Sequence, residues 1–251
     1  MLTTGQSDTS TYFDKLNTSA QYRRPNIQTT RQLMITSLPF DSSLFGYSVG
    51  KCLADDAWSE FEFLKAAKSY RLVYLFSDEP LDYRSLKIQP VDLRLTFFKN
   101  LKRRNVENAE IQPYSGSLSE TLQALAFESG VYSRFHTDPR FVNREFEKLY
   151  QLWIEKALTR QEVLIAKDQA GFVSCSVDGN DAQIGLIAVQ KNHRNKGWGK
   201  NLILAAENFA LQKGACTMTI GTQAANLPAS VLYQSIGYQL IEKNFIYHYW
   251  G

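Results

Sequence analysis

The chain of 251 residues has little of what a metal centre or a disulfide framework needs. Its three cysteines, Cys52, Cys175 and Cys216, lie far apart and form no Cys-x-x-Cys pair. This spacing argues against a zinc site and against structural disulfides, so we expect no metal. Cys175 and Cys216 fall within expected strands, where a free cysteine usually acts as a small buried apolar side chain.

Long hydrophobic runs are also absent. No apolar run approaches ~18 residues, and the first residues lack the basic-then-apolar pattern of a secretory signal. We therefore expect a soluble, cytoplasmic protein without membrane contact. The composition, 44% hydrophobic and 21% charged, is that of a globular protein. A net charge of +3 is too small to indicate nucleic acid as a partner, although it favours an anionic ligand.

Three regions are expected along the chain. Residues 1–30 are rich in Thr, Ser, Gln and Asn and predict a polar N-terminal arm. Residues 31–105 predict a small α/β lobe, whose element order echoes the later chain and indicates a degenerate half-repeat. Its expected elements are strands at 45–53, 71–76 and 91–98 and a helix at 57–69. The basic run 99–105 lacks interleaved aromatic residues, so it predicts a linker rather than a nucleic-acid patch.

Residues 106–251 predict a second, larger lobe. A capping box at Ser117 begins one expected helix, and an N-cap at Asn143 begins another that carries an apolar stripe. The stripe comprises Phe146, Leu149, Tyr150, Trp153, Ile154 and Ala157. Expected strands, of which the second to fourth form an antiparallel meander, cover 109–114, 162–166, 171–177, 181–189, 215–221 and 238–250. Two further helices are expected up to about Lys213 and at 226–236.

The stretch IGLIAVQKNHRNKGWGK, residues 184–200, predicts an anion site. An apolar strand runs into a basic, glycine-rich turn that opens a helix, so backbone N–H groups and the positive end of the helix dipole converge. Gly197 and Gly199 allow an anion to approach bare backbone. The P-loop ending and the Gly-x-Gly-x-x-Gly fingerprint are both missing. The turn is therefore interpreted as a phosphate cradle, with a polar turn whose glycines only give clearance as the alternative.

The spacing Arg194-x-x-Gly197-x-Gly199, directly after a strand, resembles the acetyl-CoA pyrophosphate loop of the GNAT superfamily of N-acyltransferases. The element order over 109–250 resembles the whole GNAT domain. The resemblance implies a mixed, mostly antiparallel sheet flanked by helices, an α/β (α+β) fold with the smaller lobe before it. It also implies acetyl-CoA as co-substrate, with these binding residues: Leu186, Ile187, Ala188, Val189, Arg194, Asn195, Lys196, Gly197, Trp198, Gly199, Lys200 and Asn226.

The same resemblance implies catalytic roles. Many members carry an Asn near the start of the helix after the fifth strand and a Tyr about two turns later, which Asn226 and Tyr233 match on nearly one helical face. Asn226 would contact the cofactor arm, and the Tyr233 hydroxyl would protonate the departing thiolate. Backbone N–H groups of Leu186, Ile187 or Val189 would stabilise the oxyanion. For Tyr233 the alternative is a packing tyrosine.

The segment SRFHTDPRF, residues 133–141, has no regular periodicity but is dense in reactive side chains. With DSSLFGYSVG, LWIEKAL and IGLIAV it resembles GNAT members that acetylate the 4-amino group of dTDP-linked dideoxy sugars. His136 is then a candidate base, Arg134 a candidate phosphate ligand, and Phe135 and Phe141 candidates for contact with a sugar or base. Surface or core roles are the alternatives.

The sequence thus predicts an enzyme, a GNAT N-acetyltransferase that acts on the amine of a nucleotide-linked amino sugar by direct attack. Two alternatives stay open at this point. One is a GNAT acetyltransferase for another amine, such as an amino acid, a peptide N-terminus or an antibiotic. The other is a non-catalytic module that binds acyl-CoA. A homodimer is also left open.

Overall fold

The computed structural model describes residues 34–55, 58–81, 83, 88–102 and 110–251. The polar arm expected over 1–30 and the boundary expected at 105 lie outside these residues, and both stay predictions. Within the described ranges, no helix is long and apolar enough to cross a lipid bilayer.

In the described part of the chain, ten strands form one sheet in the order β1-β2-β3-β10-β4-β9-β8-β7-β6-β5. The strands are β1 (Ile35–Ser37), β2 (Val49–Leu53), β3 (Leu72–Ser77), β4 (Pro90–Asn100), β5 (Ile111–Pro113), β6 (Val163–Ala166), β7 (Gly171–Asp178), β8 (Asp181–Val189), β9 (Thr217–Gln223) and β10 (Gln239–Trp250). Among the described strands, β2 pairs with β3 and β8 with β9 in parallel, and the other pairs are antiparallel. The expected mixed, mostly antiparallel sheet is confirmed.

Helices of the described chain flank this sheet. They are α2 (Pro39–Phe45), α3 (Glu60–Ala67), α4 (Glu120–Ser129), α5 (Arg134–Thr137), α6 (Glu145–Thr159), α7 (Trp198–Gln212) and α8 (Leu227–Ser235). The whole apolar stripe expected on the helix after Asn143 is buried on α6. Periodicity alone was sufficient to predict this helix and its buried face, because an amphipathic helix must bury its apolar side.

Some local predictions are wrong. The strand expected at 45–53 begins only at Val49, because Pro39 opens a helix that extends to Phe45 and that Gly46, with φ 81°, ends. The cap of α4 is Ser119, whose side chain accepts from the Leu122 N–H, and not Ser117. Asn143 is not the cap of α6: the N-cap is Arg144, and both the N–H and the side-chain Nδ2 of Asn143 donate to the Glu145 carboxylate.

The cysteines differ in their surroundings. Cys175 is fully buried on β7, as expected, and its Sγ lies 3.8 Å from the carbonyl oxygen of Ala206 on α7. Cys216 is exposed, so its predicted burial is wrong. The reason is that β9 begins only at Thr217, which leaves Cys216 in the turn before it.

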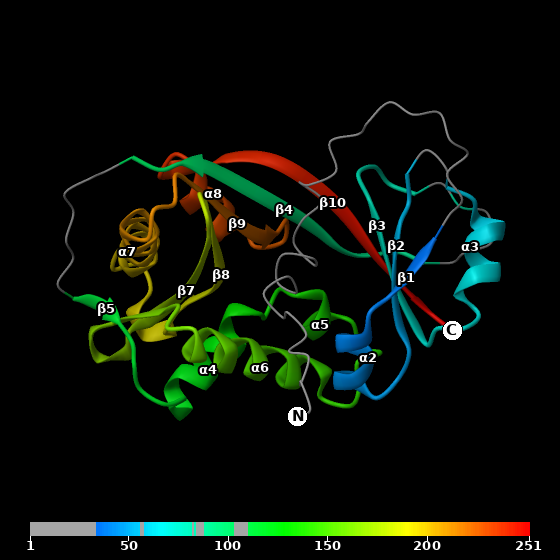
Figure 1. The fold of residues 1–251 in the computed structure, drawn as a ribbon, viewed down its shortest axis with the longest axis horizontal. Helices are drawn as coiled ribbons and strands as arrows, with labels where there is room; N and C mark the ends of the chain where they lie inside the picture. Colours follow the sequence, from blue (N-terminus) through cyan, green and yellow to red (C-terminus); the bar gives the residue numbers. More distant parts are fainter. Residues whose placement is uncertain (1–33, 56–57, 82, 84–87, 103–109) are drawn as a thin grey trace, which may run out of the picture. The chain divides into compact units, whose positions relative to one another are not determined.

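β4 and β10 lie side by side in the centre of the sheet (Figure 1). β4 precedes the expected boundary in the sequence, yet it lies between β9 and β10. β10 in turn pairs with β3 along its other edge. Side chains from both halves of the sequence therefore share the faces of these central strands.

Candidate functional site

The turn between β8 and α7 exposes backbone at the start of a long helix. After a 3-10 turn at Lys191–His193, both Asn195 and Gly197 have left-handed backbone, with φ 60° and 85°. Asn and Gly are the residues that accept this conformation most readily. Gly197 is the N-cap of α7, and no side chain caps the helix from this position. The first N–H groups of α7 are therefore suited to an anion.

Cations surround this turn. Lys191, Arg194, Lys196 and Lys200 are exposed. Arg194 also forms an ion pair with Glu128 on α4, with 2.5 Å between Nη2 and Oε1, and its Nε donates to the Val189 carbonyl at 3.3 Å. Sequence reasoning missed Glu128, because nothing in its own segment marks it. This carboxylate holds the arginine beside the turn.

β8 and β9 stop pairing shortly before the turn. Their last paired residues are Ile184 and Ile220. On the other edge of β8, the Gln190 N–H donates to the Ala170 carbonyl at 2.9 Å, and the register pairs Ala188 with Phe172. Since N–H groups alternate in direction along an antiparallel strand, those of Ile187 and Val189 point to the edge where β9 has separated.

Leu186 does not share this direction. Its N–H donates to Oγ of the buried Ser174 on β7, at 2.8 Å, next to a register shift between Val173 and Cys175. Of the three predicted oxyanion donors, the geometry therefore favours Ile187 and Val189. The bulge that engages Leu186 could not be foreseen from the β8 sequence alone.

Tyr233 lies on α8, whose N-cap is Asn226. The Asn226 side chain accepts from the Ala229 N–H at 3.4 Å. Tyr233 is buried, and its ring lies 5.6 Å from Phe97 and 6.4 Å from Tyr238. Burial raises the pKa of Tyr233 well above the usual value of a phenol, so the hydroxyl keeps its proton at any physiological pH. It can donate a proton but cannot act as a base there.

The segment 133–141 folds as α5 and the turn after it. Arg134 and Phe135 are buried, Phe141 is half-buried, and His136 is exposed with its ring 4.8 Å from Phe146. The guanidinium of Arg134 lies 4.3 Å from the Phe135 ring and 5.0 Å from the Tyr74 ring. The structure thus turns Arg134 toward the sheet and His136 toward solvent.

Asp138, which sequence reasoning missed, fixes this segment to β10. Its carboxylate accepts hydrogen bonds from Arg140, from Trp250 Nε1 at 3.2 Å and from His248 Nδ1 at 2.6 Å. Burial raises the pKa of Asp138, but the hydrogen bonds from His248 and Arg140 outweigh it and hold the pKa below its usual range. Burial lowers the pKa of His248 to about 4 although Asp138 opposes this. The pair is therefore carboxylate and neutral imidazole at neutral pH.

Two further buried carboxylates lie near Arg134. Burial raises the pKa of both Asp41, on α2, and Asp92, on β4, to about 6, and the charge of Arg134 opposes the rise in each case. A carboxylate with a pKa this near neutrality is suited to accept a proton during catalysis. No spacing motif marks either residue, so the sequence could not single them out.

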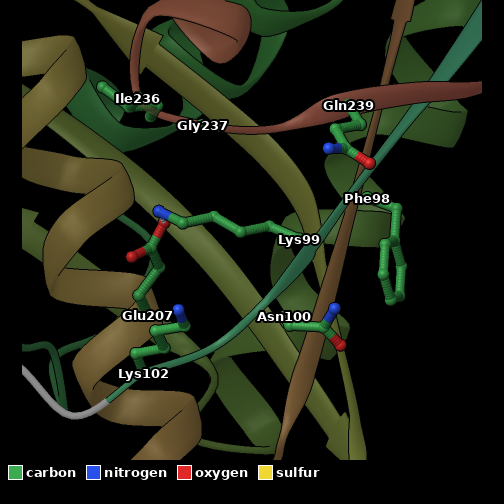
Figure 2. A pocket seen from close by; sticks show the side chains of 8 residues that line it. All are labelled: Phe98, Lys99, Asn100, Lys102, Glu207, Ile236, Gly237 and Gln239. Atoms are coloured by element: carbon green, nitrogen blue, oxygen red, sulfur yellow. Dashed lines mark hydrogen bonds and ion pairs between the residues drawn. The ribbon is translucent and has the colours of Figure 1, made fainter.

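A hollow of about 270 Å³ lies elsewhere, between β4 and α7 (Figure 2). It is lined by Phe98, Lys99, Asn100, Lys102, Glu207, Ile236, Gly237 and Gln239. The Lys99 ammonium and the Glu207 carboxylate meet there at 2.5 Å, while Phe98 leaves β4 on the opposite side from Lys99 (Figure 2). None of the predicted site residues lines this hollow. Within the described ranges, no group of three or more His, Cys, Asp or Glu could hold a metal.

Comparison with solved structures shows the fold. The chain resembles a GCN5-related N-acetyltransferase from Sphaerobacter thermophilus, with TM-score 0.53, 11% identity and coverage of 87% of this chain and 76% of the other. It also resembles a functionally unknown conserved protein from Staphylococcus epidermidis, with TM-score 0.56, 12% identity and coverage of 91% and 95%.

Two curated proteins are similar in sequence. The spore coat polysaccharide biosynthesis protein SpsD of Bacillus subtilis is 27% identical over 147 residues, which cover 56% of this chain and 50% of SpsD. The dTDP-fucosamine acetyltransferase of Escherichia coli O6:H1 is 31% identical over 124 residues, or 46% of this chain and 52% of that enzyme. The chain thus spans about half the length of these relatives.

A family comparison covers the elements of the site. Residues 126–238 match the Acetyltransferase (GNAT) family. This range includes α5, the separated strands β8 and β9, the turn at Gly197 and the helix that carries Tyr233. Over residues 126–238 the chain is therefore similar to an acetyltransferase domain of the GNAT family.

Proposed function

We propose that this protein is an acetyl-CoA-dependent N-acetyltransferase that acts on the amine of a nucleotide-linked, dTDP-type amino sugar. One observation carries the proposal. The strands β8 and β9 stop pairing after Ile184 and Ile220, which leaves one edge of β8 free. β8 then leads into the proposed anion-binding turn before α7, and β9 leads into α8, the helix that bears Tyr233. The two curated relatives, one named a dTDP-fucosamine acetyltransferase and one a polysaccharide biosynthesis protein, support a sugar acceptor.

In this proposal the turn from Arg194 to Lys200 binds the diphosphate of acetyl-CoA through backbone N–H groups and cations. The N–H groups of Ile187 and Val189 point to the edge where the thioester carbonyl would lie, so they can stabilise the oxyanion. The amine attacks the carbonyl carbon, the carbon–sulfur bond breaks, and Tyr233 gives its proton to the sulfur. Tyr233 then takes up a proton from solvent, which balances the proton that the amine releases.

The acceptor amine loses a proton in the same reaction. His136, predicted as the base, is exposed, so it can exchange protons with solvent. Asp41 and Asp92 are the further candidates because of their raised pKa values. In each case the proton passes from nitrogen to the side chain, directly or through water, and then to solvent.

The test is turnover of acetyl-CoA, followed as release of free thiol, against a panel of amines. We expect dTDP-4-amino-4,6-dideoxy sugars to give the highest kcat/KM, above amino acids, peptides with a free N-terminus and aminoglycosides. A clear preference for one of these other amines would refute the sugar nucleotide. Binding of acetyl-CoA with no turnover of any amine would refute the enzyme altogether.

We further propose that the protein works in the cytoplasm on this small-molecule acceptor, without nucleic acid or a membrane. Our hypothesis for its assembly is a homodimer, which a measurement of the molar mass by light scattering, with and without acetyl-CoA, would test. A mass of one chain under both conditions would exclude the dimer.

A further inference from the structure

Three charged side chains, Asp92 and Arg94 on β4 and Glu242 on β10, lie on one face of the central strands and form a row. Alternate residues of β4 point to opposite faces, so Asp92, Arg94 and Thr96 share a face. Phe97, on the other face, packs in the core that includes Tyr233. Arg94 is paired in register with Asn244 on β10 and with Gln223 on β9. Through Arg94 the row therefore lies next to β9, the strand that separates from β8.

The guanidinium of Arg94 occupies the space that a side chain at Gly221 of β9 would need. A Cβ on Gly221 would lie 2.8 Å from Nη2 of Arg94, closer than such contacts normally come. Gly221 is not in the left-handed region, so no backbone requirement explains a glycine in the middle of this strand. A glycine inside a strand often marks a close approach by another group, which here is the guanidinium. Gly221 directly follows Ile220, the last β9 residue that pairs with β8.

The surroundings of Arg94 contain both signs of charge. Burial and Arg134 lower the pKa of Arg94 to about 10, while Asp92 and Glu242 oppose this, so Arg94 stays charged at neutral pH. Within the described chain, Arg134 Nε and Glu242 Oε2 are buried and have no hydrogen-bond partner. Leaving a buried donor or acceptor unpaired is costly, which indicates that something else meets these atoms.

We propose that this row is the acceptor site and that Arg94 binds an anionic group of an acceptor that also carries an amine. Arg94 and Arg134 offer donors to a phosphate, and Asp92 and Glu242 offer acceptors to the amine and hydroxyl groups. Because Gly221 has no side chain, the guanidinium can lie beside the point where β8 and β9 separate, which is where the proposed function places the thioester. The inference rests on the proposed function and extends it to the chemistry of the acceptor.

The experiment uses Gly221→Ala, because the atom that the new methyl group meets is the end of a flexible side chain. The variant should fold and should displace the guanidinium rather than the strand. We expect the KM for the acceptor to rise about tenfold or more, the scale of one lost hydrogen bond to a charged group, with the KM for acetyl-CoA unchanged. Arg94→Lys should do the same, and combining the two changes should add little.

Lys99→Met is the matched control, since it removes a cation from the same strand on the opposite face. It should lower the melting temperature, because it leaves the buried Glu207 carboxylate without its counter-charge, and leave the acceptor KM as it is. An unchanged acceptor KM in a folded Gly221→Ala variant would overturn the inference. An equal rise in the KM for acetyl-CoA would overturn it as well.

Failure of the proposed function gives a different result. If the enzyme prefers another amine that carries a phosphate or carboxylate, and its KM depends on Arg94, the sugar nucleotide is wrong and the inference stands. If it prefers amines without an anionic group, the inference is wrong. Binding is read separately by calorimetric titration of dTDP-amino sugar and of amino acids into protein saturated with CoA. A wild type that binds no anionic amine there overturns the inference.

Discussion

Replacing Tyr233 by Phe removes one hydroxyl from a ring that the structure holds firmly. The ring is buried, and it packs against the rings of Phe97 and Tyr238. Phe has nearly the same shape, so we expect the stability and the affinity for acetyl-CoA to stay close to those of the wild type. Only the proton transfer to the thiolate would be lost.

The expected loss in kcat is roughly 10²-fold or more, the usual scale of general acid catalysis. This corresponds to about 2.7 kcal/mol of transition-state stabilisation. The KM for acetyl-CoA should hardly move, because the interaction is made only in the transition state. Since burial raises the pKa of Tyr233, its ionisation should not appear in the pH–rate profile below about pH 10, the usual value of a phenol.

Steady-state kinetics with thiol detection and a thermal melt provide the assay. Tyr238→Phe is the matched control, because Tyr238 is equally buried and adjacent but lies outside α8. It should retain nearly the wild-type kcat. A Tyr233→Phe enzyme within about threefold of the wild-type kcat, well short of the ~10² expected, would show that Tyr233 is only a packing residue.

Three other predictions follow from the geometry. Gly197→Asp should greatly weaken acetyl-CoA binding in calorimetry, because it places a negative charge in the proposed anion site. Gly214→Asp is the control, because Gly214 lies just beyond the far end of the same helix and also has a positive φ, 95°. It should strain the fold without changing the affinity for acetyl-CoA. Ser174→Ala should lower the free energy of unfolding in urea by about 1–3 kcal/mol by leaving the Leu186 N–H unpaired, and an unchanged value would show that the bulge does not depend on the hydroxyl. His248 has a folded pKa of about 4, below its ordinary 6.5, so the unfolded chain takes up a proton first and stability should fall as the pH drops through this range. Urea melts of His248→Gln should show a smaller loss there, and a loss equal to that of the wild type would exclude His248 as its source.

The sequence predicted elements well where one short segment determines the outcome. The stripe on α6 and the glycine turn that opens α7 at Gly197 are local patterns, and each needed only helical periodicity or turn chemistry. Asp138, Glu128 and Arg94 were missed because their roles depend on partners far away in the chain. The residues around each of them in the sequence show no periodicity and no motif that would predict these partners.

The segment 133–141 shows the same limit. The density of reactive side chains in 133–141 was visible, but the direction in which each one points was not. Arg134 is buried and His136 is exposed, since α5 is a single short turn that places successive residues on different sides. Whether these residues bind the acceptor stays a prediction.

The position of β10 has a consequence for how the protein is made. β10 separates β3 from β4, so the six residues of β3 find one of their two strand partners only in residues 245–250. During synthesis, β3 and β4 each keep an unpaired, partly apolar edge until β10 has left the ribosome. Such long-range pairing is slow and exposes edges to aggregation. The efficiency of folding should therefore depend on chaperones that shield these edges, more than the stability of the finished sheet would indicate.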